Sequence, residues 1–201
     1  LLISPPDYIQ GDSVRIMYVH VPSSFIALAC FGSMGIASIF NLIFKIKIMS
    51  LLAKSLAPIG CAFSLISIVT GSFWGKPTWG IWWVWDARLT SELILFFIYL
   101  SIIFLYHSYD DYRKGAKAAN ILAIVGFVNI PIIHFSVEWW NTLHQGPSVM
   151  KFSSPSISAE MLYPLIYTTI GFTAYFVLAV LLTTRNTLLE REKKTIWVKS
   201  I

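Results

Sequence analysis

The chain has 201 residues, of which 56% are hydrophobic and only 12% are charged, and its mean hydropathy is +0.69. These values exclude an ordinary soluble domain and predict an all-α, polytopic membrane helix bundle that forms one integral membrane domain over residues 1–201. The net charge of +5 does not indicate nucleic-acid binding, because basic residues in a membrane protein mark the orientation of its loops.

Five apolar runs are long enough to cross a bilayer as helices, which takes about 20 residues for about 30 Å of hydrocarbon. They cover residues 23–44, 56–73, 89–106, 118–135 and 161–182. Asp86 precedes the third run and is predicted to cap that helix. The chain begins with Leu1, Leu2 and Ile3, which we interpret as the end of an earlier apolar segment.

The basic residues are unevenly divided between alternate loops. One set of loops holds Lys45, Lys47, Lys54, Arg113, Lys114, Lys117, Arg185, Arg191, Lys193, Lys194 and Lys199, and the other holds Arg15, Lys76, Arg88 and Lys151. Positively charged loops stay on the cytoplasmic side. We therefore predict a cytoplasmic tail at 183–201, and an outer segment 1–22, a loop 74–91 and an outer loop 136–160 that share the opposite face.

The loop 74–91, WGKPTWGIWWVWDARLTS, is exceptionally rich in tryptophan. Its tryptophans are Trp74, Trp79, Trp82, Trp83 and Trp85. Large, rigid, mostly apolar rings on a glycine-containing loop need either a membrane interface or a flat apolar ligand to lie against. Interfacial enrichment explains part of the cluster, together with Trp139 and Trp140. The density of the cluster favours a ligand platform.

Two histidines are predicted to lie on the same outer face as this loop. His20 precedes the first span and His144 lies in the 136–160 loop. Tryptophans can stack on a porphyrin while two neutral imidazoles occupy the axial positions of its iron, so a haem would account for both features. A solvated surface role is the alternative for each histidine. His134, near the outer end of the fourth span, is interpreted as an interface histidine, and His107 as a cytoplasmic surface group.

Other polar and sulfur-containing residues have simpler interpretations. Arg15, Lys76 and Arg88 are the outer basic residues that lie near these segments in sequence, and they are candidates to pair with haem propionates. Glu92 is predicted to lie in the first turn of the third helix, where negative charge is favourable. Cys30 and Cys61 fall within apolar runs and are predicted to be small buried hydrophobes rather than a disulfide.

The run WGKPTWGIWWVWDARLTSEL closely resembles the tryptophan-rich "WWD" signature of haem-handling proteins. With the flanking segments MYVHVP and VEWWNTLHQG, the chain is similar to the cytochrome c maturation protein C family, also called haem exporter protein C, from about Pro6 to the fifth span. That family has six transmembrane helices, whereas five are predicted in this chain.

The resemblance implies a haem b site at the outer surface of the inner membrane of a bacterium or a mitochondrion. His20 and His144 would be the axial iron ligands, and the loop would contribute Trp74, Trp79, Trp82, Trp83, Trp85, Asp86 and Arg88. The implied partners are an ABC-type transporter pair, a small membrane subunit and a membrane-anchored haem chaperone. Haem delivery without catalysis is expected. A haem lyase subunit that forms the covalent adduct, and a structural permease subunit, remain alternatives.

Overall fold

The computed structural model describes residues 4–144, 146 and 156–199, and this part of the chain is helical without any β-strand. The elements are η1 (Asp12–Ile16), α1 (Met17–Phe44), α2 (Lys47–Trp79), α3 (Ala87–His107), α4 (Tyr112–Gly126), α5 (Asn129–Trp139), α6 (Ala159–Glu192) and α7 (Ile196–Lys199). Within the described residues, five helical segments are long and apolar enough to cross a membrane. The predicted multi-pass helical fold is confirmed.

The helices extend beyond the predicted membrane spans. α2 has 33 residues, about 50 Å at 1.5 Å per residue, which exceeds the hydrocarbon thickness. It continues through Trp74 to Trp79, so the first part of the 74–91 segment is helical. α2 ends at Gly80, whose φ of 79° suits a residue without Cβ and whose N–H donates to the Lys76 carbonyl at 3.0 Å. Hydropathy detects only the part of a helix that the lipid covers.

The connection from α2 to α3 is short and ends at a polar cap. The Asp86 carboxylate accepts a hydrogen bond from the Leu89 N–H at 2.8 Å, which confirms the predicted N-cap of α3. The segment from Gly80 to Asp86 therefore forms a turn that places its tryptophans between two fixed helix ends.

The fourth span is divided into α4 and α5 at Phe127 and Val128. Pro131 has no N–H and its ring conflicts with the carbonyl four residues earlier, which is that of Phe127. The N–H groups of Phe127 and Val128 instead bond to carbonyls three residues back, at 3.2 and 3.4 Å. α5 is thus a separate helix from α4, although both belong to one candidate membrane span, Tyr112–Trp139.

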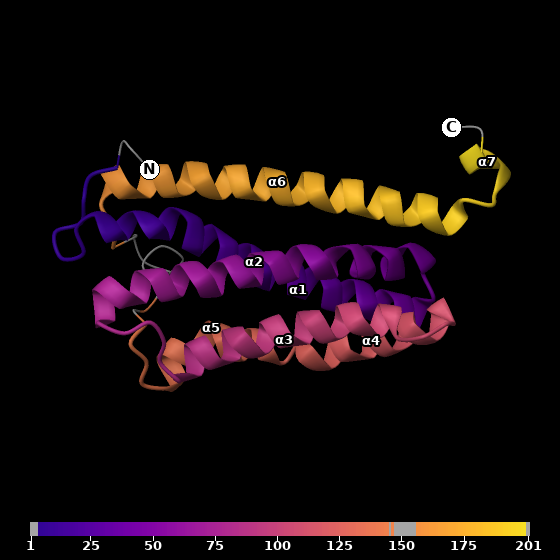
Figure 1. Cartoon of the computed structure of the whole chain (residues 1–201), viewed down its shortest axis with the longest axis horizontal. Helices are drawn as coiled ribbons and strands as arrows, with labels where there is room; N and C mark the ends of the chain where they lie inside the picture. The colour runs from indigo at the N-terminus through magenta and orange to yellow at the C-terminus, as the bar shows by residue number, and fades with distance from the viewer. Residues whose placement is uncertain (1–3, 145, 147–155, 200–201) are drawn as a thin grey trace.

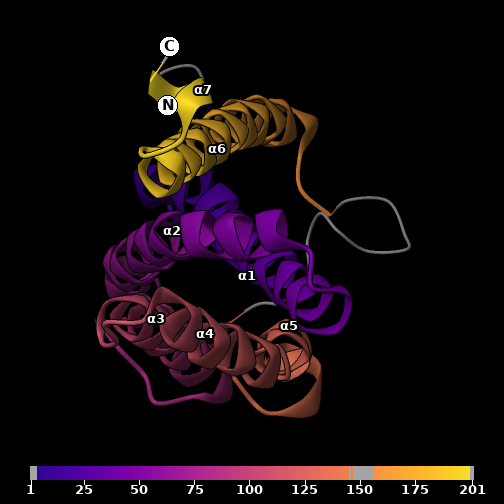
Figure 2. The same ribbon diagram turned by 90° about the vertical axis from the view of Figure 1, so that its right-hand side faces the viewer.

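The helices form layers around α1 and α2. α6 packs on one side of this pair, and α3, α4 and α5 lie on the other side (Figures 1 and 2). α6 contacts only α1 and α2 extensively, and its buried residues are Met161 and Leu165. The rest of its apolar surface is available to lipid.

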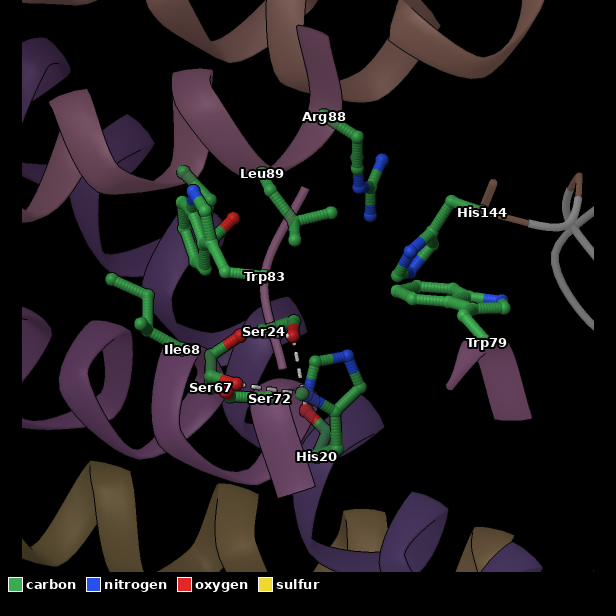
Figure 3. A pocket seen from close by; sticks show the side chains of 12 residues that line it. His20, Ser24, Ser67, Ile68, Ser72, Trp79, Trp83, Arg88, Leu89 and His144 are labelled. Carbon is green, nitrogen blue, oxygen red and sulfur yellow. Dashed lines mark hydrogen bonds between the residues drawn. The ribbon is translucent and has the colours of Figure 1, made fainter. Parts of the chain in front are cut away.

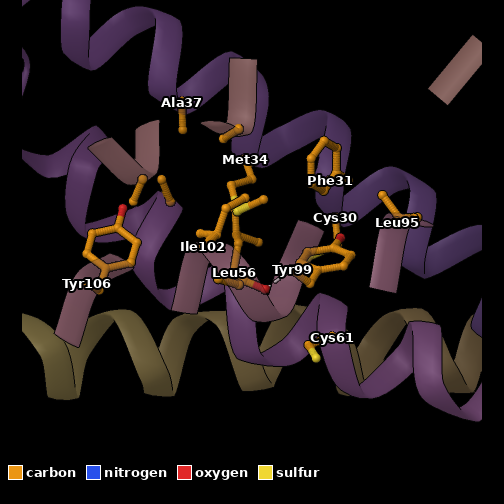
Figure 4. Close-up of a cluster of buried hydrophobic side chains, with 14 of the residues drawn as sticks. Cys30, Phe31, Met34, Ala37, Leu56, Cys61, Leu95, Tyr99, Ile102 and Tyr106 are labelled. Atoms are coloured by element: carbon orange, nitrogen blue, oxygen red, sulfur yellow. Dashed lines mark hydrogen bonds between the residues drawn. The ribbon is translucent and has the colours of Figure 1, made fainter. Parts of the chain in front are cut away.

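The core lies between α1, α2, α3 and α4, with Ile133 of α5, and Tyr99 is one of its largest members (Figure 4). The Tyr99 hydroxyl donates to the Ala27 carbonyl at 2.7 Å, and its ring meets Phe31 edge to face at 5.1 Å. Gly60 lets α2 approach α3, because a Cβ there would overlap the Tyr99 ring. Cys30 and Cys61 are free and buried nearby, as predicted.

The described parts of the three predicted outer segments lie at one end of the bundle (Figure 1). These are the approach to α1, the connection between α2 and α3, and the end of α5 with the residues that follow it. Gln145 and residues 147–155 of the predicted 136–160 loop, with Lys151 among them, lie outside the described residues, as do residues 1–3. The fold thus brings three distant parts of the sequence together at one end.

Candidate functional site

Two histidines from different parts of the sequence meet at this end of the bundle. His20 comes from α1 and His144 from the chain after α5, and their ring centroids are 6.2 Å apart with an interplanar angle of 53°. Figure 3 shows the two side chains approaching one gap from different walls. A metal–imidazole bond is about 2 Å long, so two imidazoles that bind one metal from opposite sides have ring centres about 6 Å apart. The observed spacing suits two imidazoles that bind one iron from opposite sides.

His20 is oriented by α2. Its Nδ1 lies 3.0 Å from the Ser67 carbonyl oxygen and 3.3 Å from the Thr70 hydroxyl. A carbonyl can only accept, so Nδ1 carries the proton and Nε2 keeps a lone pair for a metal. Ligating histidines are commonly oriented by such a bond from the other ring nitrogen. Its ring also meets Trp74 edge to face at 5.7 Å.

Gly71 of α2 sets the space for the His20 ring. A Cβ at this position would lie 2.8 Å from His20 Cε1 and 3.2 Å from Nδ1, too close for ordinary contact. We expect Gly71→Ala to displace the ring and lower haem affinity on the order of 10-fold, the size of effect seen when the groups that orient a metal ligand are changed. Haem titration followed by absorbance measures this change. Gly32→Ala, whose Cβ would meet only Ile130 at 3.8 Å, is the matched control and should bind like wild type.

His144 is held by Trp79, at the C-terminal end of α2. Their ring centroids are 5.6 Å apart at 60°. The His144 N–H and carbonyl both bond to the Thr142 hydroxyl, which forms a local turn. Its Nδ1 is buried and has no hydrogen-bond partner among the described residues. A buried ring nitrogen without a partner is available to bind a ligand.

Burial lowers the pKa of the His144 imidazole from 6.5 to about 3, and the nearby Arg88 and His20 side chains add to this effect. The ring is therefore neutral at physiological pH and can donate a lone pair to a metal. In the unfolded chain the ring binds a proton near pH 6.5, so this group lowers the stability of the haem-free protein as pH falls from about 6.5 toward 3. We expect the His144 ring to remain neutral at pH 5 in an NMR titration of the folded protein, and to be protonated at that pH once the chain is unfolded in urea.

A cavity of about 340 Å³ adjoins both histidines, within the range of about 300–1,000 Å³ typical of small-molecule sites. Residues of α1, α2, α3, α5 and α6 line it, and its walls are mainly apolar. A narrower recess continues from it and is bordered by His20, His144, Trp83 and Arg88 (Figure 3). Within the described residues, no three His, Cys, Asp or Glu side chains are placed to hold a metal ion together. Two histidines suffice for an iron that a porphyrin already holds.

The five tryptophans of the 74–91 segment do not share one environment. Trp79 and Trp83 line the recess, and Trp74 lines the larger cavity. Trp82 and Trp85 are 52% and 76% exposed, and they are not among the residues that line these two cavities. The segment thus presents some rings to the cavities and others to its surroundings.

Of the three candidate basic residues, Arg88 is the one that reaches the cavities. It lines both of them, and its guanidinium donates to the Ile133 carbonyl at 2.7 Å, which joins α3 to α5. Arg15 instead donates to the Ser4 carbonyl and pairs with Asp12 at 3.2 Å. Lys76 donates to the Gly80 carbonyl at the end of α2. Asp86 serves as the helix cap described above.

Several residues around the cavities are absent from the sequence-based set. Glu92 lies in the second turn of α3 rather than the first, is only 8% exposed, and lines the recess with one oxygen unpaired among the described residues. Gln10 accepts a hydrogen bond from the Trp74 indole at 2.7 Å. The sequence could have pointed to Glu92, because a carboxylate inside an apolar run is rare and commonly functional. Nothing in the sequence points to Ser67 and Gly71, because their contributions depend on how the helices pack.

Comparison with known proteins identifies the family. A family model described as "Heme exporter protein C" matches residues 1–199. Heme exporter protein C of Haemophilus influenzae is 52% identical over 201 residues, which cover 100% of this chain and 82% of that protein. The protein of the same name from Escherichia coli K12 is 47% identical over 198 residues, covering 98% and 80%.

A mitochondrial relative is also similar. A ccmC-like mitochondrial protein of Marchantia polymorpha, whose description refers to cytochrome c biosynthesis, is 47% identical over 163 residues, covering 81% of this chain and 68% of that protein. The match of the family model to nearly the whole chain agrees with the high identity to these relatives. The chain therefore belongs to the heme exporter protein C family.

Proposed function

We propose that this chain binds haem b at the non-cytoplasmic face of the membrane and delivers it to a haem chaperone for the biogenesis of c-type cytochromes. Family membership gives the chain a role in haem handling for cytochrome c maturation. The finer assignment, binding and delivery at the outer face, is supported chiefly by the pair of imidazoles at 6.2 Å beside an apolar cavity.

The residues around the cavity suit each part of a haem. His20 and His144 supply two neutral imidazoles for the axial positions of the iron, and both are held by neighbouring groups. Trp79 and Trp83 provide apolar ring surface near these ligands. Arg88 offers a planar cationic group to a propionate. The haem itself is cargo, so this chain binds and orients it, while the covalent bond forms on the chaperone.

The unequal distribution of Lys and Arg supports the proposed orientation. The cavity end of the bundle carries few basic residues, and the opposite loops carry most of them, which supports an orientation with the cavity end in the periplasm or the intermembrane space. An ABC-type transporter pair and a small membrane subunit are the proposed partners in this membrane. ATP hydrolysis by the transporter would drive release of the loaded chaperone.

Haem binding and transfer test this function together. We expect the purified chain in nanodiscs to bind one haem with a low-spin, six-coordinate spectrum, because two imidazoles complete the iron coordination. Adding the purified haem chaperone with its transporter should then move haem from the chain to the chaperone, measured by separating the two proteins. Binding of haem with a purely five-coordinate spectrum, or no transfer, contradicts the proposal.

A further inference from the structure

Three of the four histidines line the same cavity. His20 and His144 do so as the proposed axial ligands, and His134 of α5 is the third. His134 is not placed to bind one metal ion together with the other two, since no such group of three exists among the described residues. It therefore occupies a different position in the cavity wall, which the proposed function leaves without a role.

His134 is exposed on the surface of α5. Among the described residues its ring nitrogens have no hydrogen-bond partner, and its ring contact is with Phe135, edge to face at 4.7 Å. Phe135 stacks on Trp139 at 5.3 Å, and Trp139 meets Trp140 edge to face. The exposed surface of α5 thus carries an aromatic row beside the histidine. Ionisable residues within membrane spans are rare and commonly functional.

The exposed residues of the cavity wall fall into two groups. At the end of the bundle, Thr78 and Leu143 are exposed. On the side, Val21 and Phe25 of α1 are 37% and 44% exposed, and His134 faces the surroundings from α5. Among the described residues, Val21 and Phe25 of α1 and His134 of α5 form an exposed part of the cavity wall. We call this exposed part of the cavity wall the side opening, as distinct from the exposed wall at the end of the bundle.

We propose that haem reaches the cavity from the lipid through the side opening between α1 and α5, and that His134 is its first iron ligand there. This inference rests on the proposed function. Haem is a flat, largely apolar molecule, so the bilayer can supply it to an opening lined by Val21 and Phe25. A ring nitrogen of His134 forms a dative bond to the iron through its lone pair. This bond breaks when His20 or His144 binds, and no electron or proton is transferred.

The two openings then have different tasks. Haem arrives from the side, past His134, and its exposed edge is presented to the chaperone at the end, near Thr78 and Leu143. This arrangement does not require haem to cross the membrane through the bundle.

Loading kinetics test the role of His134. Haem-loaded phosphatidylcholine vesicles are mixed with the full chain in nanodiscs, and formation of the low-spin spectrum is followed by stopped-flow absorbance. We expect His134→Leu to slow loading by about 10-fold or more, because the substitution removes the first iron ligand and so raises the activation barrier for haem entry. The final low-spin spectrum should match wild type, because His20 and His144 are intact. His134→Met, which keeps a haem-ligating side chain of similar size, should retain most of the rate.

The outcomes separate this inference from the proposed function. Loading of His134→Leu at the wild-type rate overturns the role of His134, and so does a final spectrum that has lost its low-spin form, since that identifies a permanent ligand. The double variant Val21→Trp, Phe25→Trp should slow loading from vesicles more than loading from a haem–albumin complex, although both residues also line the haem cavity. Equal slowing from both sources overturns the side opening. If wild type itself binds no six-coordinate haem, the proposed function fails instead.

Discussion

Replacing His20 or His144 by Ala is expected to abolish the six-coordinate low-spin haem spectrum of this protein. Each substitution removes one of the two imidazoles whose centroids lie 6.2 Å apart, and the described part of the chain offers no third ligand to the same metal position. We expect a five-coordinate, high-spin spectrum and a loss of affinity on the order of 100-fold, about 2.7 kcal/mol. Haem titration of the detergent-purified variants, with absorbance and magnetic circular dichroism, measures both changes.

Chemical rescue distinguishes loss of a ligand from loss of the fold. In His20→Gly and His144→Gly, added imidazole should occupy the space of the missing ring and restore the low-spin spectrum. His107→Ala is the matched control, because His107 ends α3 at the opposite end of the bundle and is exposed. An unchanged low-spin spectrum in both Ala variants would remove these histidines as iron ligands.

The second large effect on haem affinity is expected from some tryptophans of the 74–91 segment and not from others. Trp79→Leu combined with Trp83→Leu should lower haem affinity by about 10-fold or more, about 1.4 kcal/mol, because both rings line the recess and Trp79 also holds His144. Trp82→Leu combined with Trp85→Leu should change affinity by less than about 3-fold, because these rings are exposed away from the cavities. Both double variants remove two tryptophans, so each is a composition-matched control for the other.

The two double variants need the same two measurements. Haem titration gives the affinity, and circular dichroism with thermal unfolding shows that both variants keep the helical fold. Equal loss of affinity in the two variants would mean that haem lies against the exposed surface of the segment rather than in the cavities. Unchanged affinity in both would support an anchoring role for the tryptophans at the membrane interface.

Much of the fold and part of the candidate site can be inferred from residue order alone. The length and composition of the apolar runs indicate the five membrane-spanning segments, because about 20 apolar residues are needed to cross a bilayer as a helix. They do not indicate that the fourth segment is divided into α4 and α5. The tryptophan-rich signature with its flanking segments indicates the family. These are local properties of the chain, and none of them depends on how helices pack against each other.

Packing decided which candidates share the site. In the sequence, Arg15, Lys76 and Arg88 are equally good candidates, because each is a basic residue near the predicted outer segments. Only Arg88 of these three lines the cavities, because its hydrogen bond to the Ile133 carbonyl holds it between α3 and α5. Likewise, α2 continues to Trp79 and so fixes where that ring meets His144. No local pattern contains these relations, since each is a contact between elements distant in the chain.

The sequence by itself determined that this is a polytopic helical membrane protein with a tryptophan-rich segment and two histidines flanking it, because hydropathy and residue type act over neighbouring positions. Only the tertiary structure decided that His20 is oriented by the Ser67 carbonyl, that Glu92 borders the recess, and that His134 lines the same cavity as the two proposed ligands. The physical reason is that helix packing sets the rotation and depth of each helix, and these decide which side chains meet.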